Sequence, residues 1–367
     1  MIKIQKENFE DFFNTPFVVY PKDFPFVSEL KMDLKRFLTQ ENPLFKKGDN
    51  FTYFTAYKNE KLAGRITAHI HNESNEKFNI QRGYFGYFDL ANDLDVAKAL
   101  LAEAEVFCKS KGCNEIIGNF NFTAMQKAGV VTKFYKLDQY TDQIINPLYV
   151  PELLAQCGYD KTFPMKTFEI DLSEIKFEAG KTEKVKKIEQ NSEFTFDNLS
   201  KSNLKEILEP MRECINEGMN QNPLFVPLTY EEIYFQAKDL TLVMDKSISV
   251  VCRHNNIPIG VIICIPDLNP MLKKMKSRMG LLTPFYFLQH KLTKDRVSMI
   301  IYSVKRDFHA QGVNSAMIAK FLTHFVKNGY KKIGGTWVAD TNIASLKIIE
   351  KFGGKPMHEL HLFSKKI

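Results

Sequence analysis

The feature that most constrains this chain is an internal repeat. The tetrapeptide Asn42–Phe45 recurs unchanged as Asn222–Phe225, and downstream of the two copies the segments Ala56–Ala68 and Cys252–Cys264 align without a gap. Each of these two segments is typical of a strand, a tight polar turn and a second strand, with asparagines at the turn that tolerate a left-handed backbone. A chain that carries the same pattern twice is expected to fold as two similar halves.

The repeat continues beyond the hairpins with a strand, an amphipathic helix ended by glycine, and a returning strand. These segments are 83–90, 95–111 and 114–120 in the first half, and 297–304, 313–328 and 331–338 in the second. A further helix and a strand-like tail close each half. Glycines align at positions 64 and 260, 112 and 329, and 158 and 353, which favours duplication over a chance similarity of two mixed folds.

This order predicts the fold class and the domain division. Each half reads as strand, two helices, hairpin, strand, helix, strand, helix and strand, and such an alternation builds a mixed sheet covered by helices. We expect an α/β (α+β) protein of two tandem domains, each a mostly antiparallel mixed sheet flanked by helices. The expected domains are residues 1–172 and 173–367, with a boundary in the polar stretch 173–193 and an insertion at about 266–296.

A resemblance to a known family is carried by the second half. The strand, loop and helix before Gly329, followed by a strand and the run Asn342–Gly354, resemble the Gcn5-related N-acetyltransferase (GNAT) superfamily. Its acetyl-CoA loop commonly reads Val-x-Pro-x-x-Arg-Gly-x-Gly-x-Gly, and in the matching stretch here Val304 and Gly312 agree with that pattern. The positions that depart from it are Arg306, His309, Ala310 and Asn314. The resemblance extends over nearly the whole chain, which is similar to tandem GNAT proteins.

The resemblance implies that the second half binds acetyl-CoA or another acyl-CoA as co-substrate, without a metal. A helix N-terminus offers unpaired N–H groups and a positive dipole end, and a loop of small residues lets those groups reach phosphate oxygens. The implied binding residues are Val304, His309, Ala310, Gln311, Gly312, Val313, Asn314, Ser315, Asn342 and Ser345. In the first half, Asp93 and Asp95 fall at the position of this loop. Two carboxylates would repel a pyrophosphate, so we expect the first domain not to bind the co-substrate.

The implied reaction is acyl transfer, most commonly acetyl transfer, to a primary amine of a small molecule or peptide by a GNAT-type N-acetyltransferase. Family members commonly use a tyrosine of the last helix as the acid, and Ile349 stands at that position here. Tyr302, near the end of the strand before the loop, is the substitute that we name as the catalytic residue. Two alternatives stay open. One is a non-catalytic acyl-CoA or metabolite-binding protein, and the other is a tRNA-dependent aminoacyl transferase.

The net charge of +7 is distributed unevenly along the chain. Residues 1–172 hold 21 basic and 23 acidic side chains, whereas residues 173–367 hold 29 and 20. Much of the excess lies in 271–296, where seven basic residues stand against one acid, Asp295, among several apolar side chains. We favour a solvated basic helix whose apolar side packs on the domain; the alternatives are a lid over the acceptor and a membrane-surface helix. Nucleic acid is not an expected partner, because aromatic–basic alternation and known motifs are absent.

The remaining signals favour a cytoplasmic protein. Met1 opens directly into polar sequence rather than into a secretory signal. The longest apolar stretch, Ile257–Pro266, is far shorter than the roughly 20 residues of a membrane-spanning helix. The six cysteines form no Cys-x-x-Cys pair and have no histidine cluster nearby, so neither zinc nor a disulfide framework is expected.

Overall fold

The first half of the chain contains the strands and helices that the repeat predicts, in the predicted order, and adds a short helix at 72–78 and a strand at 130–134. The computed structural model describes residues 1–39, 41–45, 50–172, 183–200, 202–220, 222, 224–309 and 311–367, and of residues 238–243 the backbone alone. The elements of this half are β1 (Ile2–Lys6), α1 (Phe9–Val19), α2 (Lys31–Phe37), η1 (Pro43–Phe45), β2 (Phe51–Lys58), β3 (Lys61–Ile70), α3 (Asn72–Phe78), β4 (Arg82–Leu90), α4 (Leu94–Ser110), β5 (Glu115–Gly118), β6 (Val130–Phe134), α5 (Tyr149–Gln156) and β7 (Asp160–Asp171).

The second half repeats this order with the insertion before its long strand. Its elements are α6 (Glu183–Gln190), β8 (Phe194–Asp197), α7 (Leu204–Met219), α8 (Tyr230–Val243), η4 (Lys246–Ile248), β9 (Val250–His254), β10 (Ile257–Pro266), α9 (Asn269–Met275), α10 (Thr283–Thr293), β11 (Arg296–Val304), η5 (Arg306–Phe308), α11 (Val313–Lys327), β12 (Lys332–Gly335), β13 (Val338–Ala339), α12 (Ile343–Lys351) and β14 (Lys355–Lys366). The expected boundary falls largely on residues 173–182, which lie outside the described part of the chain.

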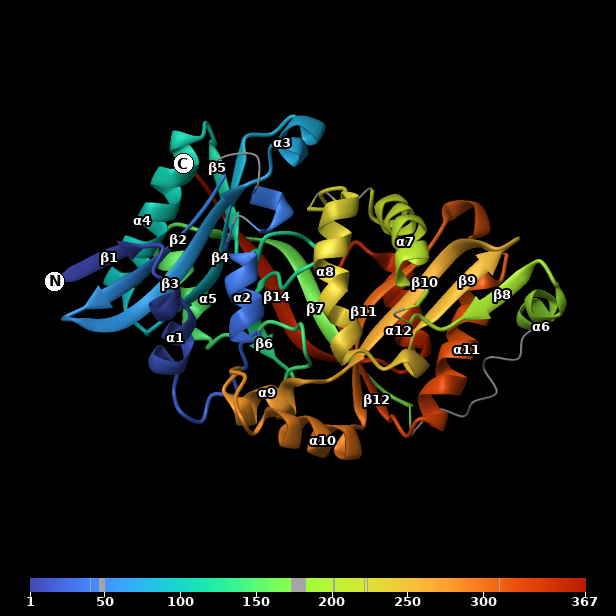
Figure 1. Ribbon diagram of the computed structural model, residues 1–367. Coiled ribbons are helices and arrows are strands. Elements are labelled where there is room, and N and C mark those ends of the chain that lie inside the picture. The colour runs from blue at the N-terminus through green and yellow to red at the C-terminus, as the bar shows by residue number, and fades with distance from the viewer. Residues whose placement is uncertain are drawn as a thin grey trace.

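The strands of both halves join in one mixed sheet (Figure 1). The strand order is β1-β2-β3-β4-β5-β14-β7-β12-β11-β10-β9-β8, with β6 paired to β14 and β13 paired to β7. Two pairs are parallel, β4 with β5 and β11 with β12, and the other pairs are antiparallel. The expected mixed α/β fold with mostly antiparallel sheets is therefore confirmed. The six cysteines are all free thiols.

The aligned residues of the two halves adopt the same backbone conformations and make equivalent contacts. The turn residues Asn59 and Asn255 both adopt left-handed conformations, with φ of 51° and 50°. Strand and helix approach closely at the aligned glycines. A Cβ at Gly64 would lie 2.7 Å from a methyl group of Leu100 in α4, and one at Gly260 would lie 2.8 Å from the sulfur of Met317 in α11. Any larger residue would push the helix off the sheet, which explains why glycine stands at both positions.

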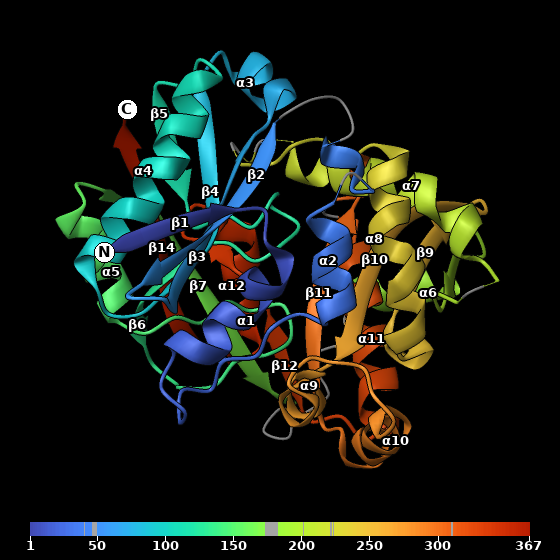
Figure 2. The ribbon, with the colours of Figure 1, turned by 60° about the vertical axis from the view of Figure 1, so that its left-hand side comes forward.

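Helices cover both faces of the sheet. The face that carries Gly64 and Gly260 is covered by α4 in the first half and α11 in the second. The other face carries α1 and α2, then α7 and α8 (Figure 2). The helices α2 and α8 meet at the junction of the halves, where Arg36 Nη1 donates to the carbonyl oxygen of Phe235 at 3.1 Å. The rings of Phe37 and Phe235 also meet edge to face at 5.3 Å. The two halves thus pack through helices as well as through the sheet.

The two halves exchange their last strands. The C-terminal strand β14 lies between β5 and β7, so that it completes the sheet of the first half. The strand β7 ends the first half but lies between β14 and β12, so that it completes the sheet of the second. Leu360 and Leu362 of β14 belong to the same buried cluster as α7 and β10, which therefore spans both halves. If the chain is divided at residue 172, the first part lacks β14, the partner of β5, and the second part lacks β7, the partner of β12.

The insertion contains two helices with opposite surroundings. Met271, Leu272 and Met275 of α9 are buried against Val27 of the first half. In α10, by contrast, His290 is the buried residue among the described side chains, and the apolar residues of the helix are largely exposed. The interpretation that the apolar side of the insertion packs on the domain is right for α9 and wrong for α10. No helix in the described part of the chain is long and apolar enough to cross a bilayer.

Replacing Leu360 by Ala tests the shared core. Leu360 is fully buried, and a leucine-to-alanine change at such a site typically lowers the free energy of unfolding by about 2–5 kcal/mol. Because β14 supports both halves, we expect the loss to appear in a single urea transition followed by circular dichroism and by fluorescence of Trp337. The control is Leu292→Ala, at a side chain that is 79% exposed, which should cost below about 0.5 kcal/mol. Two separate transitions, with the midpoint reported by Trp337 fluorescence unchanged in the variant, would contradict the shared core.

Candidate functional site

The second half contains a strand with one open edge. Pairing of β11 with β12 stops at Met299 and Gly335, whereas pairing of β11 with β10 continues to Val304. A bulge in β11 at Ile300 marks the point where the strands separate. In the described part of the chain no strand pairs with the other edge of residues 300–304, because β13 pairs with β7 instead. Backbone N–H and C=O groups along that edge are therefore available to an extended ligand.

The open edge leads into the loop that the family resemblance predicts as a phosphate site. After η5, Gly312 adopts φ of 99° and stands at the N-cap of α11, so that the first N–H groups of this helix lie beside it. The side chain of Val313 is buried in the core, so this residue can serve a ligand only through its backbone. Of the other predicted loop residues, Gln311 and Ser315 are exposed and Asn314 is partly buried. Ala310 lies outside the described residues.

Two of the predicted binding residues contact each other. The Nε2 atom of His309 lies 2.9 Å from the carbonyl oxygen of Val304, and because a carbonyl accepts, the ring nitrogen is the donor. Gln311 makes a similar contact within the loop, since its side-chain amide donates to the carbonyl oxygen of Asp307 at 2.6 Å. Both Val304 and His309 are among the residues that the family resemblance implies for binding of the co-substrate. In the structure these two groups satisfy each other, so a ligand on the Val304 carbonyl must displace the imidazole.

The charges around the loop come partly from distant segments. Lys184 of α6 lies against the loop, since a Cβ at Gly312 would be 3.1 Å from the Lys184 Cβ. Lys305 forms an ion pair with Glu213 of α7 at 3.2 Å, and the backbone N–H of Arg306 donates to Glu217 at 3.3 Å. The charge of Lys305 is thus partly neutralised. Local sequence gave no signal for Lys184, because only the tertiary fold brings α6 to the loop.

The helix α12 carries the remaining two predicted binding residues. Asn342 is its N-cap, and the Asn342 side-chain oxygen accepts the N–H of Ser345 at 3.1 Å. Although α12 is largely apolar, none of its side chains is fully buried, and Ile343 is 55% exposed. Ile349, which takes the position of the usual acid, packs against Gly354. An apolar helix with this much exposure has surface that a ligand beside it could cover.

Tyr302, the predicted catalytic residue, lies on the open stretch of β11. It packs against the hydrophobic cluster that includes Met317 and Phe321 of α11. Its hydroxyl is buried and has no hydrogen-bond partner among the described residues. Burial raises the pKa of Tyr302 well above its ordinary value, so the phenol stays protonated at neutral pH. A neutral phenol can donate a proton but cannot act as a base.

The corresponding edge in the first half is closed by side chains. The side-chain oxygens of Asn119 and Asn121 accept the backbone N–H groups of Phe88 and Tyr87, at 3.1 and 2.8 Å. At the start of α4, Asp93 accepts the N–H groups of Asp95 and Val96, at 3.1 and 3.2 Å. Both the strand edge and the helix N-terminus of this half thus have internal partners. Lys58 binds the Asp93 carboxylate, which balances its charge.

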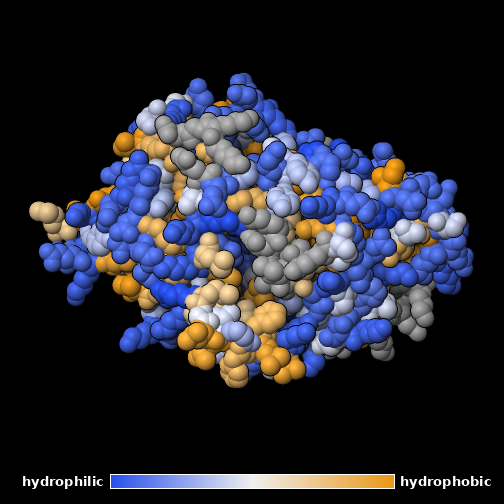
Figure 3. Space-filling view, in the orientation of Figure 1, coloured by the Kyte–Doolittle hydropathy of each residue, from blue (hydrophilic) through white to orange (hydrophobic). Residues whose placement is uncertain are grey.

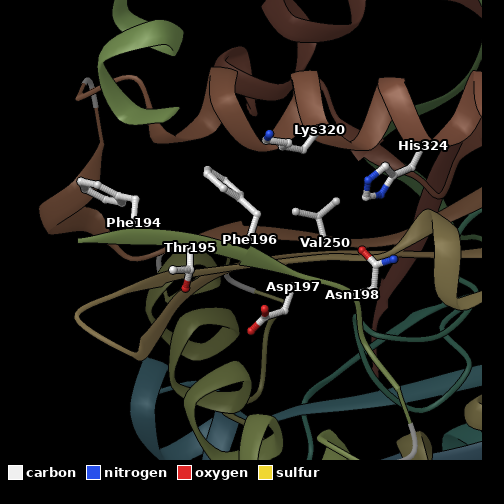
Figure 4. A pocket seen from close by; sticks show the side chains of 8 residues that line it. All are labelled: Phe194, Thr195, Phe196, Asp197, Asn198, Val250, Lys320 and His324. Carbon is white, nitrogen blue, oxygen red and sulfur yellow. The ribbon is translucent and has the colours of Figure 1, made fainter. Parts of the chain in front are cut away.

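A separate cavity of about 310 Å³ lies between the edge strand β8 and helix α11 (Figure 4). Phe196 points from β8 toward α11, which contributes Lys320 and His324, and Phe194 lies further along β8 to one side of it. The remaining lining residues are Thr195, Asp197, Asn198 and Val250. None of the predicted binding residues lines this cavity. The cavity therefore carries no argument for the predicted acyl-CoA site.

Replacing Gly312 by Ala tests the geometry of the loop. The new Cβ would meet Lys184 at 3.1 Å, and the φ of 99° is unfavourable for any residue with a side chain. We expect the free energy of unfolding to fall by about 1–2 kcal/mol, measured by urea denaturation. The matched control is Gly280→Ala, where a Cβ would meet nothing within 4 Å and the φ is not left-handed. Equal effects at the two glycines would show that the loop does not require this conformation.

Comparisons with known proteins agree with this geometry. Residues 213–354 match the Acetyltransferase (GNAT) family. The chain is 22% identical to Protein YghO of Escherichia coli over 376 residues, covering 99% of this chain and 94% of that protein. It is also 22% identical to a bacterial ceramide synthase of Caulobacter vibrioides, covering 94% of this chain and 91% of that protein. A tandem GNAT protein from the clavulanic acid biosynthesis pathway superposes with a TM-score of 0.61 at 9% identity, covering 100% of this chain and 98% of its own.

The likeness to the solved structure concerns the fold. The match to the acetyltransferase family falls in the half of the chain that has the open strand edge. That match begins in α7 and ends just after α12, so it includes β11, the Gly312 loop and α11. The tandem arrangement expected from the repeat is the arrangement of the solved protein. Residues 213–354 therefore carry the match to the Acetyltransferase (GNAT) family, and the chain as a whole has the fold of a tandem GNAT protein.

Proposed function

We propose that the protein is an acyl-CoA-dependent N-acyltransferase whose co-substrate binds to the second half. The observation that carries this proposal is the open edge of β11, which leads directly to the N-terminus of α11 at Gly312. The edge offers backbone hydrogen-bonding groups for the amides of a pantetheine arm, and the helix N-terminus offers N–H groups for its pyrophosphate. The residues present thus suit the two chemical parts of an acyl-CoA.

The first domain then has no co-substrate of its own. Asn119 and Asn121 occupy the N–H groups of β4, and Asp93 occupies those of α4. A ligand would have to displace three side chains there and approach two carboxylates. We propose that residues 1–172 serve as the structural partner of the binding domain, to which they contribute β7.

The proposed chemistry uses direct attack by the acceptor amine on the thioester carbonyl. The C–N bond forms as the C–S bond breaks, the amine nitrogen loses a proton to solvent or to a base, and the leaving thiolate takes up a proton. Tyr302 suits the last of these roles, because its raised pKa keeps it protonated and it stands on the open stretch of β11. Backbone N–H groups of the same stretch are suited to stabilise the developing oxyanion.

The relative named bacterial ceramide synthase narrows the choice of acceptor and acyl group. A ceramide is the amide of a fatty acid with a long-chain amino alcohol. Because the alignment covers more than nine-tenths of both chains, we propose that the acceptor is a long-chain primary amine and that the acyl group can be longer than acetyl. Acetyl-CoA with a short amine is the alternative that the same site accommodates.

The function is tested by incubating the full chain with acyl-CoA thioesters from acetyl to palmitoyl and a panel of amines. Thiol release and mass spectrometry of the amide are the readouts. Turnover with at least one pair supports the proposal. Binding of acyl-CoA without turnover across the panel would favour the non-catalytic binding protein. Activity that requires aminoacyl-tRNA and disappears with ribonuclease would favour the tRNA-dependent class.

Reversing the charge of Lys184 tests where the pyrophosphate binds. Because Lys184 lies against Gly312, we expect Lys184→Glu to weaken acyl-CoA binding about tenfold through repulsion at close range. Isothermal calorimetry at low salt is the measurement, and the effect should shrink as salt is added. The control is Lys327→Glu, an exposed lysine at the opposite end of α11. Equal weakening by the two variants would mean that the loop is not the anion site.

Replacing Tyr302 by Phe tests the proton donor. We expect kcat to fall by about two orders of magnitude with the acyl-CoA affinity unchanged, because the variant removes only the hydroxyl. Steady-state kinetics and calorimetry are measured on the same preparation. The control is Tyr53→Phe at a buried tyrosine of β2 in the first half, which should leave kcat unchanged. An unaltered kcat in Tyr302→Phe would reject the role of Tyr302 without rejecting the transferase.

A further inference from the structure

The helix α10 presents a row of large apolar side chains to solvent. Leu281 is 100% exposed, Phe285 62%, Leu288 57% and Leu292 79%. Large apolar side chains gathered on one surface mark a binding site more often than single exposed ones do. Figure 3 shows hydrophobic surface gathered at the lower edge of the molecule, where Figure 1 places α10. Further exposed apolar residues adjoin the row at Met279, Leu282 and Phe287.

These four side chains form one stripe that faces away from the protein. Phe285, Leu288 and Leu292 are spaced by three and four residues, which places them on the same side of α10, and Leu281 lies in the turn just before the helix. His290 is buried and lies on the opposite side, and Tyr286, also on that side, packs against the cluster around α9. The stripe is therefore not a core face that the fold has covered. We call residues 281, 285, 288 and 292 the α10 stripe.

The turn before α10 is tied to the first half. The backbone N–H of Lys31 donates to the carbonyl oxygen of Ser277 at 2.8 Å, and the hydroxyl of Ser277 donates to the carbonyl oxygen of Ser28 at 2.7 Å. The guanidinium of Arg278 lies over the ring of Phe13 at 4.9 Å. A loosely attached hairpin could fold its apolar side inward, but these contacts fix the turn that precedes α10.

Exposed lysines lie on both helices of the insertion, and Lys274 of α9 reaches α10, where its Nζ donates to the side chain of Gln289 at 2.8 Å. Lys273, Lys274 and Lys276 at the end of α9, together with Lys291 of α10, are exposed. By contrast, Lys294 is paired with Asp245, and Arg296 with Asp138 and Asp267. The charges beside the stripe therefore remain open to a partner, whereas the charges at its far end are neutralised within the fold. An apolar stripe flanked by lysines matches the chemistry of an anionic lipid surface.

We propose that the α10 stripe docks the protein onto anionic membrane surfaces, with the stripe entering the headgroup region and the lysines contacting lipid phosphates. A second copy of the chain is a poorer occupant, because it would bring two sets of lysines against each other. The helix lies in the interface rather than across it, since α10 has 11 residues. This inference stands independently of the proposed reaction, because it concerns a surface and its readout is binding.

The test is co-sedimentation of the full chain with vesicles of phosphatidylcholine containing about one-third phosphatidylglycerol, compared with pure phosphatidylcholine. We expect binding to the anionic vesicles and little to the neutral ones. The variant Phe285→Ser/Leu288→Ser/Leu292→Ser should lower the partition coefficient by at least about tenfold. The variant Lys273→Gln/Lys274→Gln/Lys291→Gln should lower the partition coefficient on anionic vesicles by a similar factor, with each lost charge contributing about fivefold or less. It should leave the binding to neutral vesicles unchanged.

The matched control is Val106→Ser/Val326→Ser, which removes two exposed apolar side chains from α4 and α11, 64% and 51% exposed. It should bind vesicles as the wild type does. Because all substituted side chains are exposed, circular dichroism should show the same fold in every variant. Failure of the wild type to bind anionic vesicles, or unchanged binding by the triple serine variant, would overturn the proposal. So would analytical ultracentrifugation that finds a dimer which dissociates in the serine variant, with no vesicle binding.

Discussion

The antiparallel pairing of β7 with β14 is the contact on which the rest of the structure depends. Each strand belongs by sequence to one half and completes the sheet of the other, so the parallel pairs β4–β5 and β11–β12 both rest on this central pair. A sheet edge that is left unpaired exposes backbone N–H and C=O groups. The exchange of β7 and β14 between the halves covers two such edges, those of β12 and β5. The second half therefore obtains its continuous sheet from a strand that lies more than a hundred residues upstream of its Gly312 loop.

Backbone hydrogen bonding also decides how the two halves differ. Both contain the same diverging parallel strands, but in the first half asparagine side chains satisfy the N–H groups that divergence leaves open. In the second half the corresponding edge of β11 has no strand partner among the described residues, and one carbonyl is satisfied by the His309 ring. Two side-chain amides and one capping carboxylate are thus enough to satisfy the backbone groups that diverging strands and a helix N-terminus leave open.

Much of the fold was predictable from sequence, because the residues that indicate it act through local geometry. The hairpin asparagines and the glycines at positions 64 and 260 report turn geometry and close strand–helix contact, which need no knowledge of the rest of the chain. The strand exchange was not predictable, because the two tails have similar patterns and either can pair with either sheet. The position of Lys184 and the neutralisation of Lys305 by Glu213 were missed for the same reason: each depends on a contact between distant segments.

The structure shows where the net positive charge of the second half lies and which of its side chains are paired. Much of this charge lies in the insertion at 271–296, yet several of the insertion's cations form ion pairs inside the fold. Hydrogen bonds from Lys294, Ser247 and Tyr330 outweigh the burial of Asp245 and lower its pKa to about 2, so Lys294 is held in place at any ordinary pH. The insertion's lysines that remain exposed lie on α9 and α10, and Lys184 and Lys187 are exposed on α6, the helix that lies against the Gly312 loop. The exposed positive charge of this half is therefore divided between the surface of the insertion and the neighbourhood of the loop.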